Sequence, residues 1–394
     1  MTEYDNDAEL IDIASETKTT GFWRAICAQY RNAFSRRYYF ARYENAPLGL
    51  RFRTTNQCNE NCPHCFECSG PHNPSKYIAP QDIAYYINNA GSEFADIYIT
   101  GGEWSLIYDR HPNYLSHIFQ HVNLSQAKSN AWGIQTNARW THGPHCQEIL
   151  SDLKYIQDRL STINTEMKLD TSVDRYHSDL AIDGTRKLIR QLATRPDFNN
   201  TKIRIMSCAK DRLMANNRIL NPERLAKQNI ELSFEPRSFY QPNFQRLWAN
   251  HIKIVVHEEG TIMRIGRAKK NKFGYRIFEP DLQCGGLGGD TPQMDISFRE
   301  DGTAKWHNYY DWDITTPYKL PDGTNKPLSQ IRSELINAGW KKHIRFYTSE
   351  HAMVLLCPFV ALPYAIWRNW QIRKTYRENN PVITYIAQDI EHMH

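Results

Sequence analysis

Residues 58–65 read Cys58-Asn59-Glu60-Asn61-Cys62-Pro63-His64-Cys65, and a further cysteine, Cys68, follows shortly after them. Three residues separate the first two cysteines of this stretch, and two separate the next pair. Thiolates at this spacing can hold one side of an iron–sulfur cluster, because the loop folds back on itself every few residues. With only three protein thiolates, one iron keeps an open coordination position. Such an arrangement is typical of a catalytic site rather than of a purely structural one.

Three other interpretations of these cysteines are open at this point. Cys58, Cys62, Cys65 and Cys68 are a possible closed zinc site, although structural zinc sites usually take their ligands from two well-separated pairs. Cys62-Pro63-His64-Cys65 alone resembles a thiol–disulfide oxidoreductase motif, which leaves Cys58 and Cys68 without a role. A chance cluster of buried cysteines is disfavoured by the polar residues of the loop.

The cysteines follow a stretch that alternates like a β-strand, Leu48–Arg53. Similar short runs recur at residues 96–100, 132–136, 167–171, 202–206 and 230–234, with helical spacing of apolar residues between them. This recurrence is typical of βαβ units and a parallel sheet. Six units predict an α/β fold, a partial (β/α)6 TIM-like barrel, whose active site lies in the loops at the carboxyl ends of the strands.

A second motif, Gly101-Gly102-Glu103, stands at the end of the second predicted strand. Two glycines allow a backbone to approach a ligand closely, and the adjacent acid can bind an ammonium group. By itself this motif is weak. Directly after the strand that follows the cysteine loop, it is a strong indication of a cofactor site.

On these motifs the chain resembles the radical S-adenosylmethionine (radical SAM) superfamily. The resemblance implies one [4Fe–4S] cluster on Cys58, Cys62 and Cys65, and no auxiliary cluster, because only Cys284 and Cys357 lie in the C-terminal region. It implies S-adenosylmethionine contacts from Gly101, Gly102, Glu103, Gln135, Thr136, Asn137, Ser172 and Arg186. Two positions depart from the superfamily pattern: His64 replaces the usual aromatic residue, and Cys68 is extra and is interpreted as a non-ligand.

The implied reaction is reductive cleavage of S-adenosylmethionine at the cluster to a 5′-deoxyadenosyl radical, which abstracts a hydrogen atom from a substrate C–H bond. The electron comes from an external donor such as flavodoxin or ferredoxin. The expected substrate is a peptide or natural product. The alternatives are a small metabolite (an amino acid, sugar or nucleoside) changed by rearrangement, elimination or epimerisation, and a non-catalytic [4Fe–4S] binding or sensing protein.

Catalytic residues beyond the cluster are less well defined by the sequence. Cys284 and Cys357 are candidate hydrogen donors, and Asp174 is a candidate substrate contact. The remaining candidates, His177, Asp311 and Asp313 for the substrate and His307 for a metal, are each more often ordinary structural residues.

Three regions are expected: an N-terminal helical extension (residues 1–46), the partial barrel (47–250) and a smaller α+β C-terminal subdomain (251–394). Gly266-Arg267-Ala268 and two hairpins resemble the SPASM/twitch branch of the superfamily, in a degenerate form. The first hairpin is expected between His251–Val256 and Thr261–Ile265. The second turns at Glu300-Asp301-Gly302.

Composition restricts the class of protein. With 41% hydrophobic and 12% aromatic residues among 394, the chain can bury a core, which excludes disorder throughout. No apolar run approaches the roughly 18 residues that span a bilayer, and the start of the chain is acidic, unlike a signal peptide. An odd number of cysteines, 9, argues against a disulfide framework. We therefore expect a soluble, cytoplasmic protein without a membrane partner, and a net charge of +5 does not require nucleic acid.

Overall fold

The fold was analysed in a computed structural model. It describes residues 46–65, 67–90, 94–127, 131–208, 218–235, 244–259, 267, 294–306 and 314–339. All of these belong to the second of two compact units, Ala46–His394. In this part of the chain no helix is long and apolar enough to cross a membrane.

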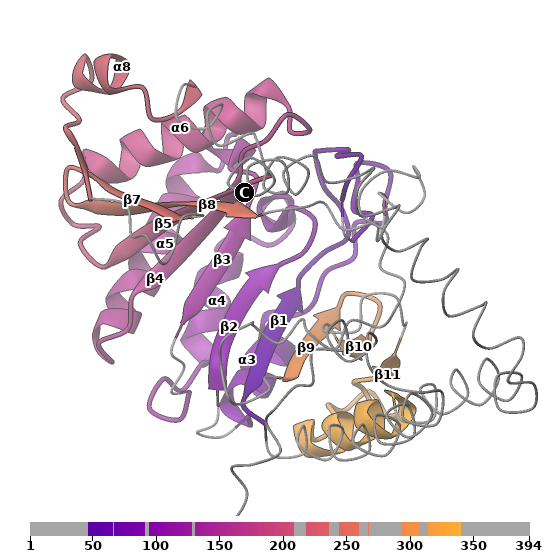
Figure 1. Cartoon of the computed structure of the whole chain (residues 1–394). Coiled ribbons are helices and arrows are strands. Elements are labelled where there is room, and N and C mark those ends of the chain that lie inside the picture. Colours follow the sequence, from indigo (N-terminus) through magenta and orange to yellow (C-terminus); the bar gives the residue numbers. More distant parts are fainter. Residues whose placement is uncertain are drawn as a thin grey trace, which may run out of the picture. The chain divides into compact units, whose positions relative to one another are not determined.

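One large sheet organises the described residues (Figure 1). Its strands are β1 (Leu48–Arg53), β2 (Phe94–Thr100), β3 (Trp132–Thr136), β4 (Met167–Ser172), β5 (Thr201–Cys208), β6 (Leu232–Phe234), β7 (Phe244–Ala249), β8 (Ile252–Glu259), β9 (Met294–Arg299), β10 (Thr303–Trp306) and β11 (Thr315–Pro317). Their order is β11-β10-β9-β1-β2-β3-β4-β5-β8-β7-β6. The seven strands from β9 to β8 are parallel, and the outer strands on both sides are antiparallel.

The mostly parallel α/β sheet confirms the predicted fold class, whereas the closure of six units into a partial barrel stays a prediction. The first five predicted strands are β1 to β5. The sixth prediction, residues 230–234, is wrong as a parallel strand, because β6 is a three-residue strand antiparallel to β7. The place beside β5 is taken by β8.

Both predicted hairpins concern strands of this sheet. The segment Thr261–Ile265 of the first predicted hairpin lies outside the described residues. Its predicted partner, His251–Val256, is wrong as a hairpin strand with that segment, because β8 has β5 at one edge and β7 at the other. The hairpin at Glu300-Asp301-Gly302 is confirmed as the antiparallel pair β9 and β10. Since β9 also pairs with β1, this hairpin continues the sheet that carries the cysteine loop. The predicted boundaries at residues 46 and 250 remain predictions.

Helices pack against the sheet: α3 (Pro80–Asn88), α4 (Tyr114–His121), α5 (Cys146–Ser161), α6 (Asp179–Ala193) and the short α8 (Pro222–Ala226). Two 3₁₀ helices, η1 (Trp104–Ile107) and η2 (Arg139–His142), follow β2 and β3. Residues 328–339 are also helical. In Figure 1, α3, α4 and α5 lie behind the sheet, on one of its faces.

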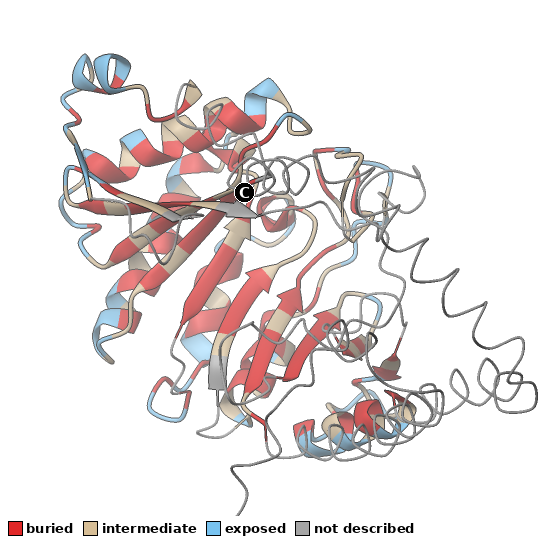
Figure 2. Ribbon diagram, in the orientation of Figure 1, coloured by how far each residue is buried: buried red, intermediate tan, exposed pale blue. Residues whose placement is uncertain are grey.

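Helix α6 shows why these elements form. Ser178 caps its N-terminus by accepting a hydrogen bond from the backbone N–H of Ala181, and Asp179 adds a negative charge to the first turn. Its apolar residues recur every three or four positions, so that Ile182, Leu188 and Leu192 are all buried. The strands β1 and β3 are buried almost continuously, as expected for a parallel sheet with both faces covered, and this core is the red centre of Figure 2.

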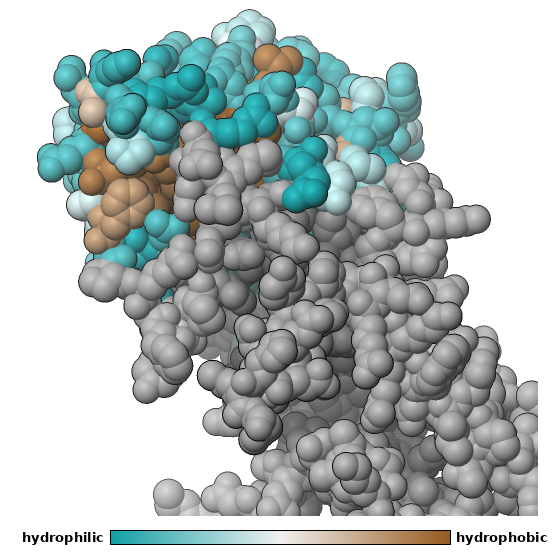
Figure 3. All heavy atoms as spheres, turned by 45° about the horizontal axis from the view of Figure 1, so that its top comes forward, coloured by the Kyte–Doolittle hydropathy of each residue, from teal (hydrophilic) through white to brown (hydrophobic). Residues whose placement is uncertain are grey.

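The edge of the sheet formed by β6 and β7 is less covered by other residues. Phe234 on β6 and Trp248 on β7 are exposed. Figure 3 shows a hydrophobic area on an otherwise mostly hydrophilic part of the described surface.

The parallel register brings the carboxyl ends of β1 to β4 to the same end of the sheet, since Arg53 pairs with Thr100 and Thr136 with Thr171. Every motif that the sequence singles out between residues 58 and 174 lies at the end of one of these four strands or after it.

Candidate functional site

The cysteine loop between β1 and α3 is a compact turn structure. The backbone N–H of Cys58 donates to the carbonyl of Gly70 at 3.1 Å, which closes the loop. Within it, the N–H of Cys65 donates to the carbonyl of Cys62 at 3.1 Å, and that of Cys68 to Cys65 at 3.3 Å. The sequence therefore folds back every three residues, as the spacing predicts, and all four cysteines carry free thiols.

Arg267 holds this loop from a distant part of the sequence. Its guanidinium donates to the carbonyl oxygens of Cys62, at 2.7 Å, and Ser69, and its backbone N–H donates to the carbonyl of Cys65 at 2.8 Å. The sequence singled out Gly266-Arg267-Ala268 as a branch signature, but gave no sign that Arg267 lies against the cysteines. A positive charge here partly offsets the effect of burial, which raises the pKa of the Cys65 thiol.

The loop thiols are not among the side chains whose ligand atoms are gathered most closely in the described residues. A tetrahedral zinc ion holds its thiolates only about 3.8 Å apart, given a zinc–sulfur distance near 2.3 Å. Among the described residues, one set of three His, Cys, Asp or Glu side chains has its ligand atoms within 4.8 Å of one another, and it contains no cysteine. Cys58 is buried, and this burial raises the pKa of its thiol, with the neighbouring Cys62 and Cys65 adding to the effect. A multi-iron cluster suits this donor set better than zinc does.

The glycines of Gly101-Gly102-Glu103 approach the chain's own backbone. A Cβ on Gly102 would lie 2.0 Å from the carbonyl oxygen of Gln57, and one on Gly101 would lie 2.7 Å from that of Thr55. The N–H of Gly102 donates to Thr55 at 2.7 Å, and the N–H of Glu103 to Gln57 at 2.8 Å. The close approach inferred from the two glycines is thus made to the start of the cysteine loop.

Glu103 is fully buried, with 0% of its surface exposed. Its carboxylate accepts hydrogen bonds from the Thr136 hydroxyl, at 2.9 and 3.0 Å, and from the backbone N–H of Asn137 at 2.8 Å. Burial raises the pKa of this carboxyl, while these hydrogen bonds oppose the rise. Glu103 therefore ties the end of β2 to the end of β3, and its predicted contact with an ammonium group remains a prediction.

The predicted segment Gln135-Thr136-Asn137 also meets the cysteine loop. Asn137 donates from Nδ2 to Asn59 Oδ1 at 2.6 Å and towards Cys58 Sγ at 3.7 Å. Gln135 accepts from the Thr100 hydroxyl at 2.7 Å. The structure thus brings three predicted segments together, those that follow β1, β2 and β3.

Ser172 and Arg186, the two remaining predicted cofactor contacts, lie farther along the fold. Ser172 is the half-buried last residue of β4. Arg186 lies on α6, where it donates to Asp183 at 2.5 Å and to the carbonyl of Arg218 at 3.1 Å. These hydrogen bonds turn the guanidinium of Arg186 to its own helix and to residue 218, so its predicted contact with the cofactor remains a prediction.

Glu60 anchors the loop and was missed by the sequence analysis. Although charged, it is buried, and it accepts from Arg139 at 3.0 Å and from both the backbone N–H and the hydroxyl of Ser178. The Arg139 guanidinium also donates to the carbonyl of Asn59 at 2.5 Å. One carboxylate thus joins the cysteine loop to η2 and to the cap of α6.

Replacing Glu60 by glutamine should therefore destabilise the protein. We expect Glu60→Gln to lower the free energy of unfolding by about 1–3 kcal/mol, because a buried hydrogen-bonded network loses its charged acceptor. Urea unfolding followed by circular dichroism measures the change. Asp158→Asn removes an exposed ion pair with Lys154 and should change stability by about 0.5 kcal/mol or less. Equal effects of the two substitutions would contradict the anchoring role.

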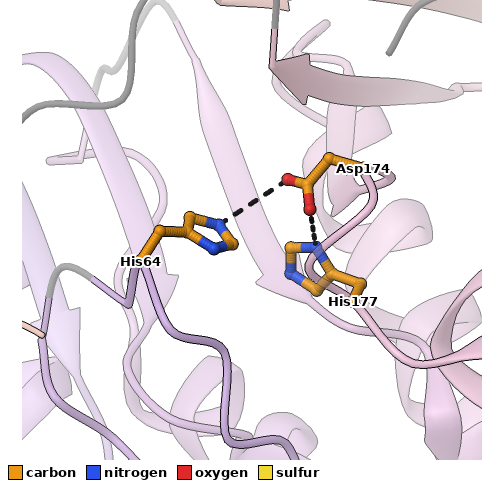
Figure 4. A group of neighbouring side chains, drawn as sticks. All are labelled: His64, Asp174 and His177. Atoms are coloured by element: carbon orange, nitrogen blue, oxygen red, sulfur yellow. Dashed lines mark hydrogen bonds and ion pairs between the residues drawn. The ribbon is translucent and has the colours of Figure 1, made fainter. Parts of the chain in front are cut away.

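His64 of the cysteine loop lies close to two side chains that follow β4, Asp174 and His177 (Figure 4). His177 Nδ1 is 2.9 Å from Asp174 Oδ1, and His64 Nε2 is 3.6 Å from Asp174 Oδ2. The ring of His64 also packs against Tyr176, with centroids 5.0 Å apart. Asp174 and His177 were predicted as substrate contacts, but the approach of His64 across more than a hundred residues was not expected.

The electrostatics of this group of side chains favour an ionised carboxylate. Burial opposes ionisation of Asp174, but His177 and His64 outweigh it and lower the pKa of the carboxyl to about 2. Burial also lowers the pKa of His177, whereas its hydrogen bonds with Asp174 and Cys62 raise it to about 10. Burial lowers the pKa of His64. His177 therefore connects this group of side chains to Cys62, a proposed ligand of the iron–sulfur cluster.

Several predicted residues lie outside the described part of the chain. These are Cys284 and Cys357, the candidate hydrogen donors, together with His307, Asp311 and Asp313. The N-terminal extension as far as residue 45 lies outside it as well. Cys146, predicted as a core thiol, is buried at the start of α5 and accepts a hydrogen bond from Gln191.

Comparison with known proteins gives structural similarities only. No sequence profile of a protein family matches the chain, and no curated protein matches it in sequence. Histidine-tagged anSMEcpe with bound AdoMet is 12% identical, over 75% of this chain and 82% of that one, with a TM-score of 0.41. SuiB of Streptococcus suis, bound to its precursor peptide SuiA, is 11% identical, over 77% of this chain and 68% of that one, with a TM-score of 0.35. Native anSMEcpe with bound AdoMet and the Cp18Cys peptide is 14% identical, over 49% of this chain, with a TM-score of 0.31; the match spans about half, 54%, of that structure.

Proposed function

We propose that this chain is a radical S-adenosylmethionine enzyme that binds one [4Fe–4S] cluster through Cys58, Cys62 and Cys65. The observation that best supports the proposal is the position of the cysteine loop. It lies at the carboxyl edge of the parallel sheet, hydrogen-bonded to the segments after β2 and β3. Ligand sites of α/β sheets lie at this edge.

The donor set fits such a cluster. The thiols are free and come from one tightly turned loop. Arg267 places a positive charge beside them, which suits a group of net negative charge. The side-chain amide of Asn137 points a donor at Cys58 Sγ, and hydrogen bonds to the sulfurs are one of the factors that set the reduction potential of such a cluster.

When bound, the cluster supplies the electron that cleaves S-adenosylmethionine into methionine and a 5′-deoxyadenosyl radical, which abstracts a hydrogen atom from the substrate. The protein's own residues position the reactants and exclude water. The burial of Cys58 and Glu103 keeps solvent from this side of the loop. We propose that S-adenosylmethionine lies along residues 101–103 and 135–137, with Ser172 at the end of the next strand.

We further propose a peptide or natural product as the substrate, because the resemblance at Gly266-Arg267-Ala268 is to the branch that mostly modifies peptides. An external donor such as flavodoxin or ferredoxin would supply the electron. The partial barrel, the smaller C-terminal subdomain and the hydrogen-donor roles of Cys284 and Cys357 belong to the same proposal.

Anaerobic reconstitution tests the proposal. We expect about four irons per chain, as for one cysteine-ligated cluster, and 5′-deoxyadenosine on addition of dithionite and S-adenosylmethionine. Iron analysis and liquid chromatography of the nucleoside measure the two results. A count near eight would show a second cluster, and a reconstituted protein that never forms 5′-deoxyadenosine would contradict the enzymatic function.

A further inference from the structure

His64, Asp174 and His177 bring two imidazoles and one carboxylate to a single point (Figure 4). They come from two loops, the one after β1 and the one after β4, whose strands are separated in the sheet by β2 and β3. One ligand atom of each lies within 4.8 Å of those of the other two. We infer that these three side chains form a binding site for one divalent transition-metal ion, with zinc the best match.

The distances are compatible with an ion, although His177 Nδ1 and Asp174 Oδ1 are also hydrogen-bonded at 2.9 Å. His64 Nε2 and Asp174 Oδ2 are 3.6 Å apart, which is too long for a hydrogen bond. Ligands about 2.0–2.1 Å from a tetrahedral zinc ion stand about 3.3 Å from one another. The observed separations, 2.9 Å from His177 Nδ1 to Asp174 Oδ1 and 3.6 Å from His64 Nε2 to Asp174 Oδ2, lie on either side of this value.

The three side chains are mostly shielded from solvent, as the ligands of a binding site usually are. The side chains of Asp174 and His177 are only 4% and 10% exposed, and that of His64 is 18% exposed. His64 Nδ1 is buried and has no hydrogen-bond partner among the described residues. Within this part of the chain that nitrogen is therefore an unsatisfied buried polar atom, while Nε2 of the same ring faces Asp174. A buried carboxylate between two histidines is the kind of donor set that holds a cation.

The donor set differs in chemistry from the three proposed cluster ligands, although His64 lies in the cysteine loop and His177 is hydrogen-bonded to Cys62. Nitrogen and oxygen ligands suit zinc, iron(II) or cobalt(II), whereas the softer thiolates suit an iron–sulfur cluster. Three protein ligands leave at least one coordination position open, which is typical of catalytic rather than structural zinc. An oxygen or nitrogen atom of a substrate, such as a peptide carbonyl or carboxylate, is the chemical class that this position would take.

Cobalt(II) provides the probe, because its visible spectrum reports the type of ligand. The full chain carrying Cys58→Ala, Cys62→Ala and Cys65→Ala is titrated with cobalt(II) alone, so that the three loop thiols cannot compete. We expect one cobalt per chain, with ligand-field bands and no thiolate charge-transfer band. His64→Phe, Asp174→Asn or His177→Phe in this background should each weaken binding at least about tenfold, since removal of even a supporting group costs 10–100-fold.

His145→Ala is the matched control. His145 also lies between two carboxylates, with Nδ1 3.0 Å from Glu148 and Nε2 3.0 Å from Asp109, but these two contacts use opposite sides of the ring. It should leave cobalt affinity unchanged. Absence of cobalt binding, or binding unaffected by His64→Phe and Asp174→Asn, would overturn the inference.

A second measurement covers the case in which the triple variant does not fold. X-ray absorption at the zinc edge of the zinc-loaded wild-type chain should then show nitrogen and oxygen neighbours that are lost in Asp174→Asn, and sulfur neighbours alone would overturn the site. Neither experiment involves the iron–sulfur cluster, so the inference stands or falls separately from the proposed function.

Discussion

Replacing any one of Cys58, Cys62 and Cys65 by alanine is expected to abolish the brown iron–sulfur chromophore, whereas Cys68→Ala should retain it. In the proposed site each of the three supplies a ligand that the loop could not replace, because hydrogen bonds with Gly70 and Arg267 fix its backbone. We expect iron in the three variants to fall from about four per chain to nearly none. Ultraviolet–visible spectra and iron analysis after anaerobic reconstitution measure the loss.

Cys146→Ala is the control for the loss of a cysteine as such. Its thiol is buried at the start of α5, where it accepts a hydrogen bond from Gln191 at 3.3 Å. This variant should keep the full iron content. Loss of the chromophore in Cys68→Ala alone, with the three proposed ligands intact, would contradict the ligand assignment and favour a four-cysteine site.

Gly102→Ala should be among the most destabilising single substitutions in the chain. The added Cβ would lie 2.0 Å from the carbonyl oxygen of Gln57 and 2.6 Å from its carbonyl carbon, both of them backbone atoms. The segment after β2 must then move away from the cysteine loop and lose the hydrogen bonds from Gly102 to Thr55 and from Glu103 to Gln57. We expect a loss of more than about 4 kcal/mol in the free energy of unfolding, the range of exceptional substitutions. Urea unfolding measures it.

Gly323→Ala separates the clash from the ordinary effect of removing a glycine. Gly323 has φ +83° and nothing within 4 Å of an added Cβ. Its replacement should cost about 1–2 kcal/mol, the penalty of a left-handed conformation for a residue with a side chain. A Gly102→Ala protein as stable as Gly323→Ala would show that the segment after β2 does not pack on the cysteine loop.

The positions of the first five strands, β1 to β5, could be predicted from local patterns. Each is a short apolar run followed by polar residues, and such runs recur along the chain with helical segments between them. The sixth parallel strand, which lies beside β5, could not be predicted in this way. Leu232–Phe234 and Ile252–Glu259 both look like strands, and which of them lies beside β5 depends on packing that no local pattern records.

The candidate site, too, was determined partly by the sequence and partly by the tertiary structure. The cysteine spacing and the glycine pair are local features, so the sequence alone determined the candidate cluster ligands and the candidate cofactor segment. Only the tertiary structure decided that Gly102 contacts Gln57, that Glu103 accepts from Thr136 and Asn137, and that Arg267 holds the loop. It also decided that His64 lies beside Asp174. The physical reason is that ligand spacing is set within one loop, whereas these contacts join residues far apart in the sequence, which meet only when the parallel strands bring their carboxyl ends to one edge.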